Sequence, residues 1–87
     1  MGRRGWTIVA LGLLAPASAL AASCDELWYA RNSVYKEAGY CFKTARAIRA
    51  FGNAGCRYDQ EGAVPLSRQQ RAYIDDIQRQ ERFQGCR

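Results

Sequence analysis

Four cysteines in a short chain limit this protein to a small cross-linked domain. The chain has 87 residues, 4 Cys and no His, a length that allows one small domain at most. The cysteines lie at positions 24, 41, 56 and 86. Zinc ligands usually come in close pairs such as C-x-x-C, and these wide gaps favour two disulfides over a metal site. We expect no metal and no other cofactor.

The amino terminus has the three parts of a secretory signal peptide. Arg3-Arg4 supplies the basic start, residues 7–14 are almost wholly apolar, and Ala19-Leu20-Ala21 has the small-x-small pattern of a cleavage site. The apolar stretch is shorter than the roughly 20 residues that a spanning helix needs. We predict a signal peptide over residues 1–21 and one domain over residues 22–87, with no transmembrane segment after cleavage.

Two details of processing stay open. Cleavage after Ala22 is the alternative to cleavage after Ala21. Cys24 follows Ala21-Ala22-Ser23, which also resembles a degenerate lipoprotein site. Lipid on Cys24 would leave an odd number of cysteines, so we favour the unmodified residue. Removal of Arg3 and Arg4 lowers the net charge of the chain from +5 to +3.

The four cysteines allow three pairings, of which we favour Cys41–Cys56 and Cys24–Cys86. The first pair encloses a short predicted helix, and the second joins the two ends of the domain. In the chain-entropy description these bonds stabilise the fold by about 3 and about 4 kcal/mol. The domain needs them, because so small a core supplies no more than roughly 3–5 kcal/mol.

Three short helices are predicted, each beginning at a capping residue and ending at a glycine. They cover about residues 24–38, 44–51 and 67–84, and Gly, Asn and Pro mark an ordered loop over residues 53–65. A short extended link, Tyr40-Cys41-Phe42, joins the first two. Apolar residues recur at helical spacing: Leu27, Trp28, Val34, Tyr35 and Ala38, then Ala47, Ile48 and Phe51, then Ala72, Tyr73, Ile74 and Ile77. We expect a small all-α, disulfide-stapled fold.

Two stretches, Arg31-Asn32-Ser33-Val34-Tyr35 and Gly39-Tyr40-Cys41-Phe42-Lys43, resemble the YARHG domain family. Its members show R-N-x-[IV]-Y-A-R-H-G-Y-x-F, then a helix that opens with Leu-Ser and ends in I-x-x-x-E. Similar residues here are Leu66, Ser67, Ile74, Ile77 and Glu81, so the resemblance covers about residues 24–86. It implies a bacterial exported protein, periplasmic or secreted, of unknown molecular activity.

The naming segment of the family lies over residues 35–39, where Glu37 and Ala38 replace its Arg and His. The chain therefore resembles a cysteine-containing branch, and no role that needs this His carries over. The earlier Tyr29-Ala30-Arg31 matches three letters but has the wrong flanks.

The motif residues have two possible roles. In a structural role, Tyr35, Tyr40 and Phe42 fill a small core, Gly39 allows a tight helix exit, and Arg31 and Asn32 hydrogen-bond the loop backbone. The alternative is a binding site made by Arg31, Asn32 and Tyr35. We favour the structural role.

The chain lacks the groups that most catalytic sites need. It has no His, and all four thiols are assigned to disulfides. Asp75 and Asp76 are adjacent on a helix and point about 100° apart, so they do not face each other as a glycosidase pair does. We predict that the protein is not an enzyme.

A non-catalytic module that binds an envelope polymer or a protein ligand is the function we favour. The alternative is a secreted inhibitor or toxin-like effector that presents the 53–65 loop to a protein partner. Basic residues such as Arg46, Arg49 and Arg57 suit anionic polymers or lipid headgroups. Export argues against a nucleic-acid partner, and we expect a monomer.

Overall fold

The computed structural model describes residues 22–87, and within them three α-helices follow one another without a strand. The elements are α2 (Cys24–Glu37), α3 (Ala45–Phe51), the single 3₁₀ turn η2 (Glu61–Ala63) and α4 (Arg68–Gln84). The prediction of a small all-α, disulfide-stapled fold is confirmed. The predicted signal peptide over residues 1–21 lies outside the described residues.

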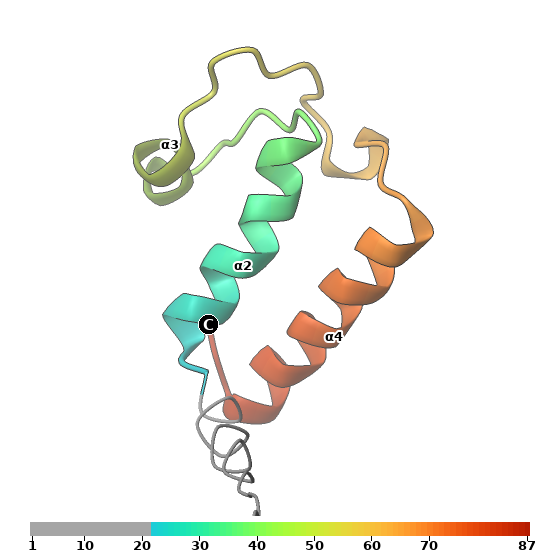
Figure 1. The fold of residues 1–87 in the computed structure, drawn as a ribbon. Coiled ribbons are helices and arrows are strands. Elements are labelled where there is room, and N and C mark those ends of the chain that lie inside the picture. Colours follow the sequence, from blue (N-terminus) through green and yellow to red (C-terminus); the bar gives the residue numbers. More distant parts are fainter. Residues whose placement is uncertain (1–21) are drawn as a thin grey trace, which may run out of the picture.

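Helix α2 is the centre of the fold. It packs along α4 on one side and against α3 on the other. Helices α2 and α4 run in opposite directions, so the start of α2 and the end of α4 lie together, while α3 and the following loop occupy the other end (Figure 1). The 53–65 loop contains η2 and leads the chain across to α4.

The predicted helix caps are present. Ser23 Oγ accepts a bond of 3.0 Å from the Glu26 amide, and the Glu26 carboxylate accepts one of 2.8 Å from the Ser23 amide. Ser67 and Gln70 exchange the same two bonds at the start of α4. Thr44 Oγ1 accepts from the Ala47 amide at 3.2 Å. These contacts satisfy amides that a helix start otherwise leaves unpaired.

The two disulfides are Cys24–Cys86 and Cys41–Cys56, the pairing favoured from the sequence. The first closes a separation of 62 residues between the start of α2 and the end of α4. The second closes a separation of 15 residues around α3. Within residues 22–87 the structure has no free cysteine and no group of side chains that could hold a metal ion.

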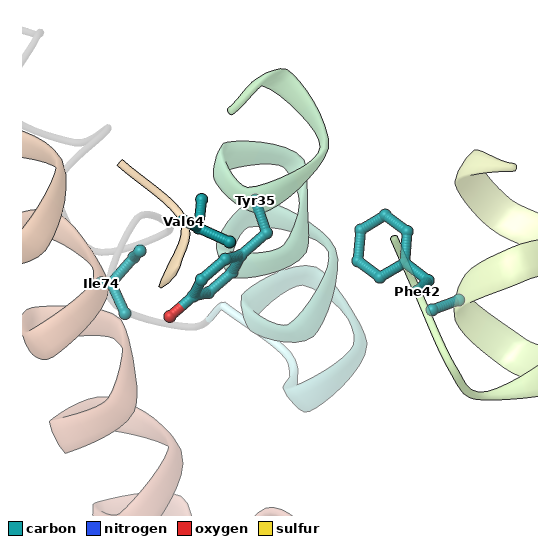
Figure 2. Close-up of a cluster of buried hydrophobic side chains, with 5 residues drawn as sticks. Tyr35, Phe42, Val64 and Ile74 are labelled. Atoms are coloured by element: carbon teal, nitrogen blue, oxygen red, sulfur yellow. The ribbon is translucent and has the colours of Figure 1, made fainter. Parts of the chain in front are cut away.

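The core lies on both sides of α2. Val64 and Ile74 flank the ring of Tyr35 toward α4, whereas Phe42 lies on the α3 side (Figure 2). The buried residues are Leu27, Tyr35, Phe42, Ala47, Val64, Ile74 and Ile77. Three predicted core residues are exposed instead, because α3 and α4 each pack against α2 with one face and present the other to solvent. Tyr73 is 51% exposed, Ile48 is 43% exposed, and Ala72 also faces solvent.

Gly39 joins the end of α2 to the 53–65 loop. Its φ of +96° is a conformation that residues with a side chain rarely adopt, and a Cβ here would meet the Tyr58 ring at 3.3 Å. Its carbonyl accepts from the amides of Arg57 (2.7 Å) and Tyr58 (3.0 Å). The Tyr58 carbonyl accepts in turn from the Cys41 amide at 2.8 Å. The loop is therefore hydrogen-bonded to the helix exit, as the prediction of an ordered loop required.

Removal of either disulfide should destabilise the domain, and the longer cross-link should matter more. We expect Cys24→Ser with Cys86→Ser to lower the free energy of unfolding by about 4 kcal/mol, and Cys41→Ser with Cys56→Ser by about 3 kcal/mol. In a domain of this size each kcal/mol shifts Tm by roughly 4–8 °C. Thermal unfolding followed by circular dichroism measures both shifts. A reduced protein as heat-resistant as the oxidised one would contradict the prediction.

Candidate functional site

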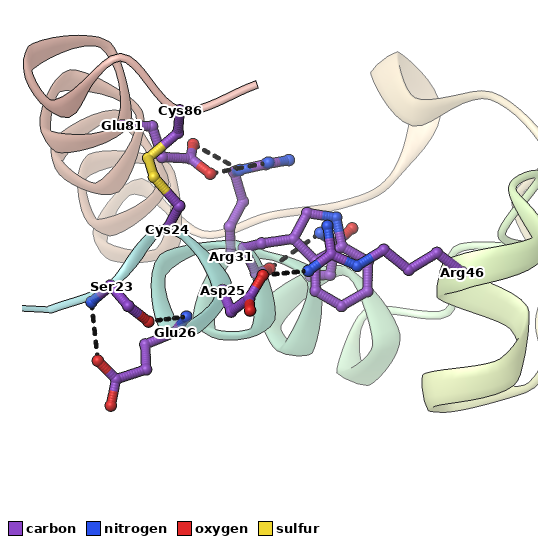
Figure 3. Close-up of polar contacts among 10 residues, drawn as sticks. Ser23, Cys24, Asp25, Glu26, Arg31, Arg46, Glu81 and Cys86 are labelled. Carbon is purple, nitrogen blue, oxygen red and sulfur yellow. Dashed lines mark hydrogen bonds and ion pairs between the residues drawn. A yellow bond between two sulfur atoms is a disulfide. The ribbon is translucent and has the colours of Figure 1, made fainter.

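Arg31 forms the main polar contact between α2 and α4. Its Nε and Nη2 donate to the two carboxylate oxygens of Glu81, each at 3.0 Å (Figure 3). The two side chains are only 22% and 14% exposed. A paired, two-point contact of this kind is strong and directional. Both residues belong to the YARHG-like pattern. Their contact explains in structural terms why the pattern contains an arginine in the first helix and a glutamate in the last.

The expected contact of Arg31 and Asn32 with the loop backbone is wrong. Arg31 reaches α4, and Asn32 Nδ2 donates to the Trp28 carbonyl one turn earlier in α2, at 2.9 Å. Asn53 performs the expected role instead. Its side-chain amide accepts from the Phe42 amide at 2.7 Å and donates to the Phe42 carbonyl at 3.0 Å. The sequence marks Asn53 only as a loop residue, because its partner lies beyond α3.

The motif aromatics pack in one continuous row. Tyr35 meets Tyr40 edge-on, with ring centroids 5.8 Å apart, and Tyr40 meets Phe42 edge-on at 5.2 Å. Phe42 stacks on Phe51 of α3 at 5.2 Å, and Phe51 lies 4.8 Å from Tyr29 of α2. Such pairs add about 0.5–1.5 kcal/mol each beyond the area they bury. The row connects α2, the extended link and α3.

The segment that replaces the family's naming motif ends α2. Glu37, at the position of the motif Arg, is exposed. Ala38, at the position of its His, packs against the core cluster as the helix C-cap. This end of the helix therefore carries neither a cationic nor an imidazole side chain from the motif.

Two polar hollows lie along the seam between α2 and α4. One, of about 230 Å³, is lined by Tyr35, Leu66, Arg71, Ile74, Asp75 and Gln78. The other, of about 330 Å³, is lined by Arg31, Gln78, Glu81, Arg82, Cys86 and Arg87. Gln78 lines both, so we treat them as one surface and call it the seam groove. The groove includes two of the three residues proposed from sequence, Arg31 and Tyr35, and not Asn32.

The seam groove offers hydrogen-bond donors of two kinds. Arg31 is committed to Glu81, whereas Arg71 and Arg82 form no ion pair with any residue of the described chain. Tyr35 is 8% exposed. Burial, and then the negative charge of Glu61, raise the pKa of the Tyr35 hydroxyl. The hydroxyl therefore remains a neutral donor at physiological pH.

The acidic residues of α4 do not form a catalytic pair. Asp75 lines the seam groove, whereas Asp76 lines a separate hollow at the other edge of the α2–α4 contact, together with Leu27, Tyr73 and Ile77. Asp76 also accepts a bond from Arg79 at 2.9 Å. The two carboxylates face different sides of the helix, as their adjacent positions predict.

A second polar cluster connects α2 with α3. The Arg46 guanidinium lies 3.8 Å from the centroid of the Trp28 ring, and its Nη2 donates to Asp25 at 2.9 Å (Figure 3). This cation–π contact was not predicted, because residues 28 and 46 are distant in sequence. Contacts of this kind at exposed sites contribute about 0.5–1 kcal/mol. They fix α3 against α2 and leave Arg46 engaged.

The two disulfides and the small size of the fold are typical of exported domains. Small domains held by disulfides mature in oxidising compartments, outside the cytoplasm. Among residues 22–87, no helix is long and apolar enough to span a membrane.

Comparison with protein families identifies the domain. The YARHG domain matches residues 6–82, most of the 87 residues, and the chain belongs to this family of exported domains. The match begins inside the predicted signal peptide and ends before Cys86, so its bounds differ from the 24–86 expected from the motifs. No curated protein and no solved structure matches the chain.

The Arg31–Glu81 contact should contribute measurably to stability. We expect Arg31→Met and Glu81→Gln each to lower the free energy of unfolding by about 1–3 kcal/mol, because each leaves a mostly buried partner without its contact. A double-mutant cycle in urea should give a coupling energy of about 1–2 kcal/mol. The exposed Asp76–Arg79 pair is the matched control, with an expected coupling below about 0.5 kcal/mol. Equal coupling for both pairs would contradict the prediction.

Tyr35 should ionise at a higher pH in the folded protein than in the unfolded chain. Its raised pKa means that the folded state keeps a proton which the unfolded state loses near the ordinary value of 10.0. The stability due to this difference is complete below that pH and is lost as the pH rises through the folded pKa. We expect the tyrosinate absorbance of the 5 tyrosines to rise with one delayed component. Tyr35→Phe should remove that component.

Proposed function

We propose that the protein is an exported, non-catalytic module that binds a polar ligand of the bacterial cell envelope. The cleaved signal peptide expected over residues 1–21 and the family of exported domains support the location. The disulfides support an oxidising compartment such as the periplasm or the exterior. The proposal is of a monomer that acts without a cofactor.

The seam groove is the observation that carries the binding role. Arg71 and Arg82 lie along one side of the seam without an ion-pair partner in the described chain, and Gln78 lies between the two hollows. Carboxylate oxygens are suitable acceptors for guanidinium groups. Asp75 adds an acceptor, whereas the Tyr35 hydroxyl is already hydrogen-bonded to Glu61. A ligand with carboxylates and hydroxyl or amide groups, such as the peptide and glycan of peptidoglycan, fits this chemistry.

The absence of catalytic activity rests on the residues that the chain offers. It has no His, its cysteines form disulfides, and its adjacent aspartates face apart. A general base with a pKa near neutrality is the usual requirement for acid–base work.

Binding should depend on the two unpaired arginines of the groove. We expect the purified oxidised protein to sediment with peptidoglycan sacculi at low salt. Arg71→Ala with Arg82→Ala should weaken this binding at least tenfold, because each charge-assisted hydrogen bond contributes about 1.5–3 kcal/mol.

The matched control is Arg68→Ala with Arg79→Ala, which removes the same charge from the same helix outside the groove. It should bind as the unmodified protein does. An equal loss in both variants would show that net charge alone decides retention. No retention of the unmodified protein would count against this ligand.

A secreted inhibitor or toxin-like effector is the second candidate, and the 53–65 loop supports it. Hydrogen bonds at Asn53 and Gly39 and the disulfide at Cys56 anchor the loop, whereas residues 59–63 are exposed. A rigidly held, exposed turn suits recognition of a protein. Here replacement of residues 59–63 by a Gly-Ser stretch would abolish capture of a stoichiometric protein partner while sacculus binding persists.

A further inference from the structure

The positive charge of the domain is concentrated in one segment. Residues 38–58 contain four basic residues, Lys43, Arg46, Arg49 and Arg57, and no acidic residue. The rest of the described chain has seven Lys and Arg against eight Asp and Glu, a net charge of −1. Helix α4 mixes the two signs along its length. The net charge of +3 that remains after residues 1–21 therefore arises entirely from this segment.

The fold holds this segment rigidly at one end of the molecule. The Cys41–Cys56 disulfide and the Asn53–Phe42 hydrogen bonds close it into a ring around α3. Figure 1 shows α3 and the following loop at the end away from the joined chain ends. Helix α3 has only seven residues and would not persist alone. The ring therefore keeps α3 folded and holds its basic residues in a fixed arrangement.

The outward side of α3 combines charge with exposed apolar groups. Ala47 is buried and Phe51 packs on aromatic neighbours, which fixes the inward side of the helix. Ile48 is 43% exposed, and Arg49 is exposed beside it. Tyr29, which lies against Phe51 with centroids 4.8 Å apart, is 53% exposed. We call these residues, together with the exposed Arg57 that follows the Cys41–Cys56 ring and hydrogen-bonds Gly39, the α3 surface.

Two of its arginines are available for a partner. Arg46 is held by Asp25 and the Trp28 ring. Arg49 and Arg57 form no ion pair with any residue in the described part of the chain. Unpaired guanidinium groups next to an exposed aliphatic and an exposed tyrosine match the layered chemistry of a lipid interface, where phosphates lie above a shallow apolar layer and tyrosines concentrate.

We infer that the α3 surface docks the domain on an anionic lipid surface. The complementarity of charge carries the inference: residues 38–58 have a net charge of +4, and they carry the exposed Ile48 with Arg49 and Arg57, which form no ion pair within the described chain. The attraction to an anionic leaflet decays within about one Debye length, roughly 10 Å at 0.1 M salt. The seam groove lies between α2 and α4 and includes no residue of α3, so a domain docked through the α3 surface would leave the groove free for its own ligand.

The test is sedimentation of the oxidised protein with lipid vesicles. Vesicles of phosphatidylglycerol and phosphatidylcholine should bind it at low salt, and vesicles of phosphatidylcholine alone should not. Arg49→Gln with Arg57→Gln should weaken binding about 25-fold, since each basic residue contributes about fivefold at an anionic surface. Ile48→Ser should weaken binding without a change in its salt dependence.

Arg68→Gln with Arg79→Gln is the matched control. It removes two positive charges from α4 and leaves the rest of the chain unchanged. It should bind the vesicles as the unmodified protein does, and thermal unfolding checks that every variant folds. Equal loss in the control would overturn the inference, because net charge would then explain binding. Equally tight binding to soluble polyphosphate, with no effect of Ile48→Ser, would assign the surface to a soluble polyanion instead.

Discussion

Two disulfides hold together a core that is too small to do so alone. Cys24–Cys86 fixes the start of α2 to the end of α4, and Cys41–Cys56 fixes the ring that carries α3. A domain of this size buries only about 60% of the surface of its unfolded chain. Each cross-link removes conformations from the unfolded state and so offsets part of that deficit. The disulfides hold the helices and the loop close together, and the packing and hydrogen bonds between these elements add further stability.

Helix α2 lies between α4 and α3, so the structure has two sides with different surface groups. Its α4 side holds Arg31–Glu81, the Tyr35 hydroxyl and the seam groove. Its α3 side holds the aromatic row and the basic ring. Polar recognition of a ligand and attachment to a charged surface would therefore use different residues. Variants on one side leave the other intact, which makes the two roles separable.

The family pattern is explained here mainly by structure. Arg31 pairs with Glu81, Tyr35 and Phe42 are buried, and Gly39 has a backbone conformation that suits glycine and accepts two loop amides. None of these four roles needs the Arg or His that gives the family its name. In this chain Glu37 is exposed and Ala38 caps the helix, so the helix exit forms without the Arg and His of the naming motif.

Local signals determined much of this fold from the sequence alone: the caps at Ser23 and Ser67, the glycines that end the helices, and a cysteine spacing that favoured the observed pairing. Such features act between residues close in the chain, or through loop length, and so can be read in one dimension. Which apolar residues are buried was decided by tertiary structure, since Ile48 of α3 and Tyr73 of α4 lie on helix faces that α2 does not cover. The partners of Arg31, Trp28 and Asn53 were likewise decided there. Each partner lies 11 or more residues away in the chain. Packing of α2 against α4 and α3 brings the partners of Arg31 and Trp28 close, and the ring closed by Cys41–Cys56 brings Asn53 to the Phe42 backbone.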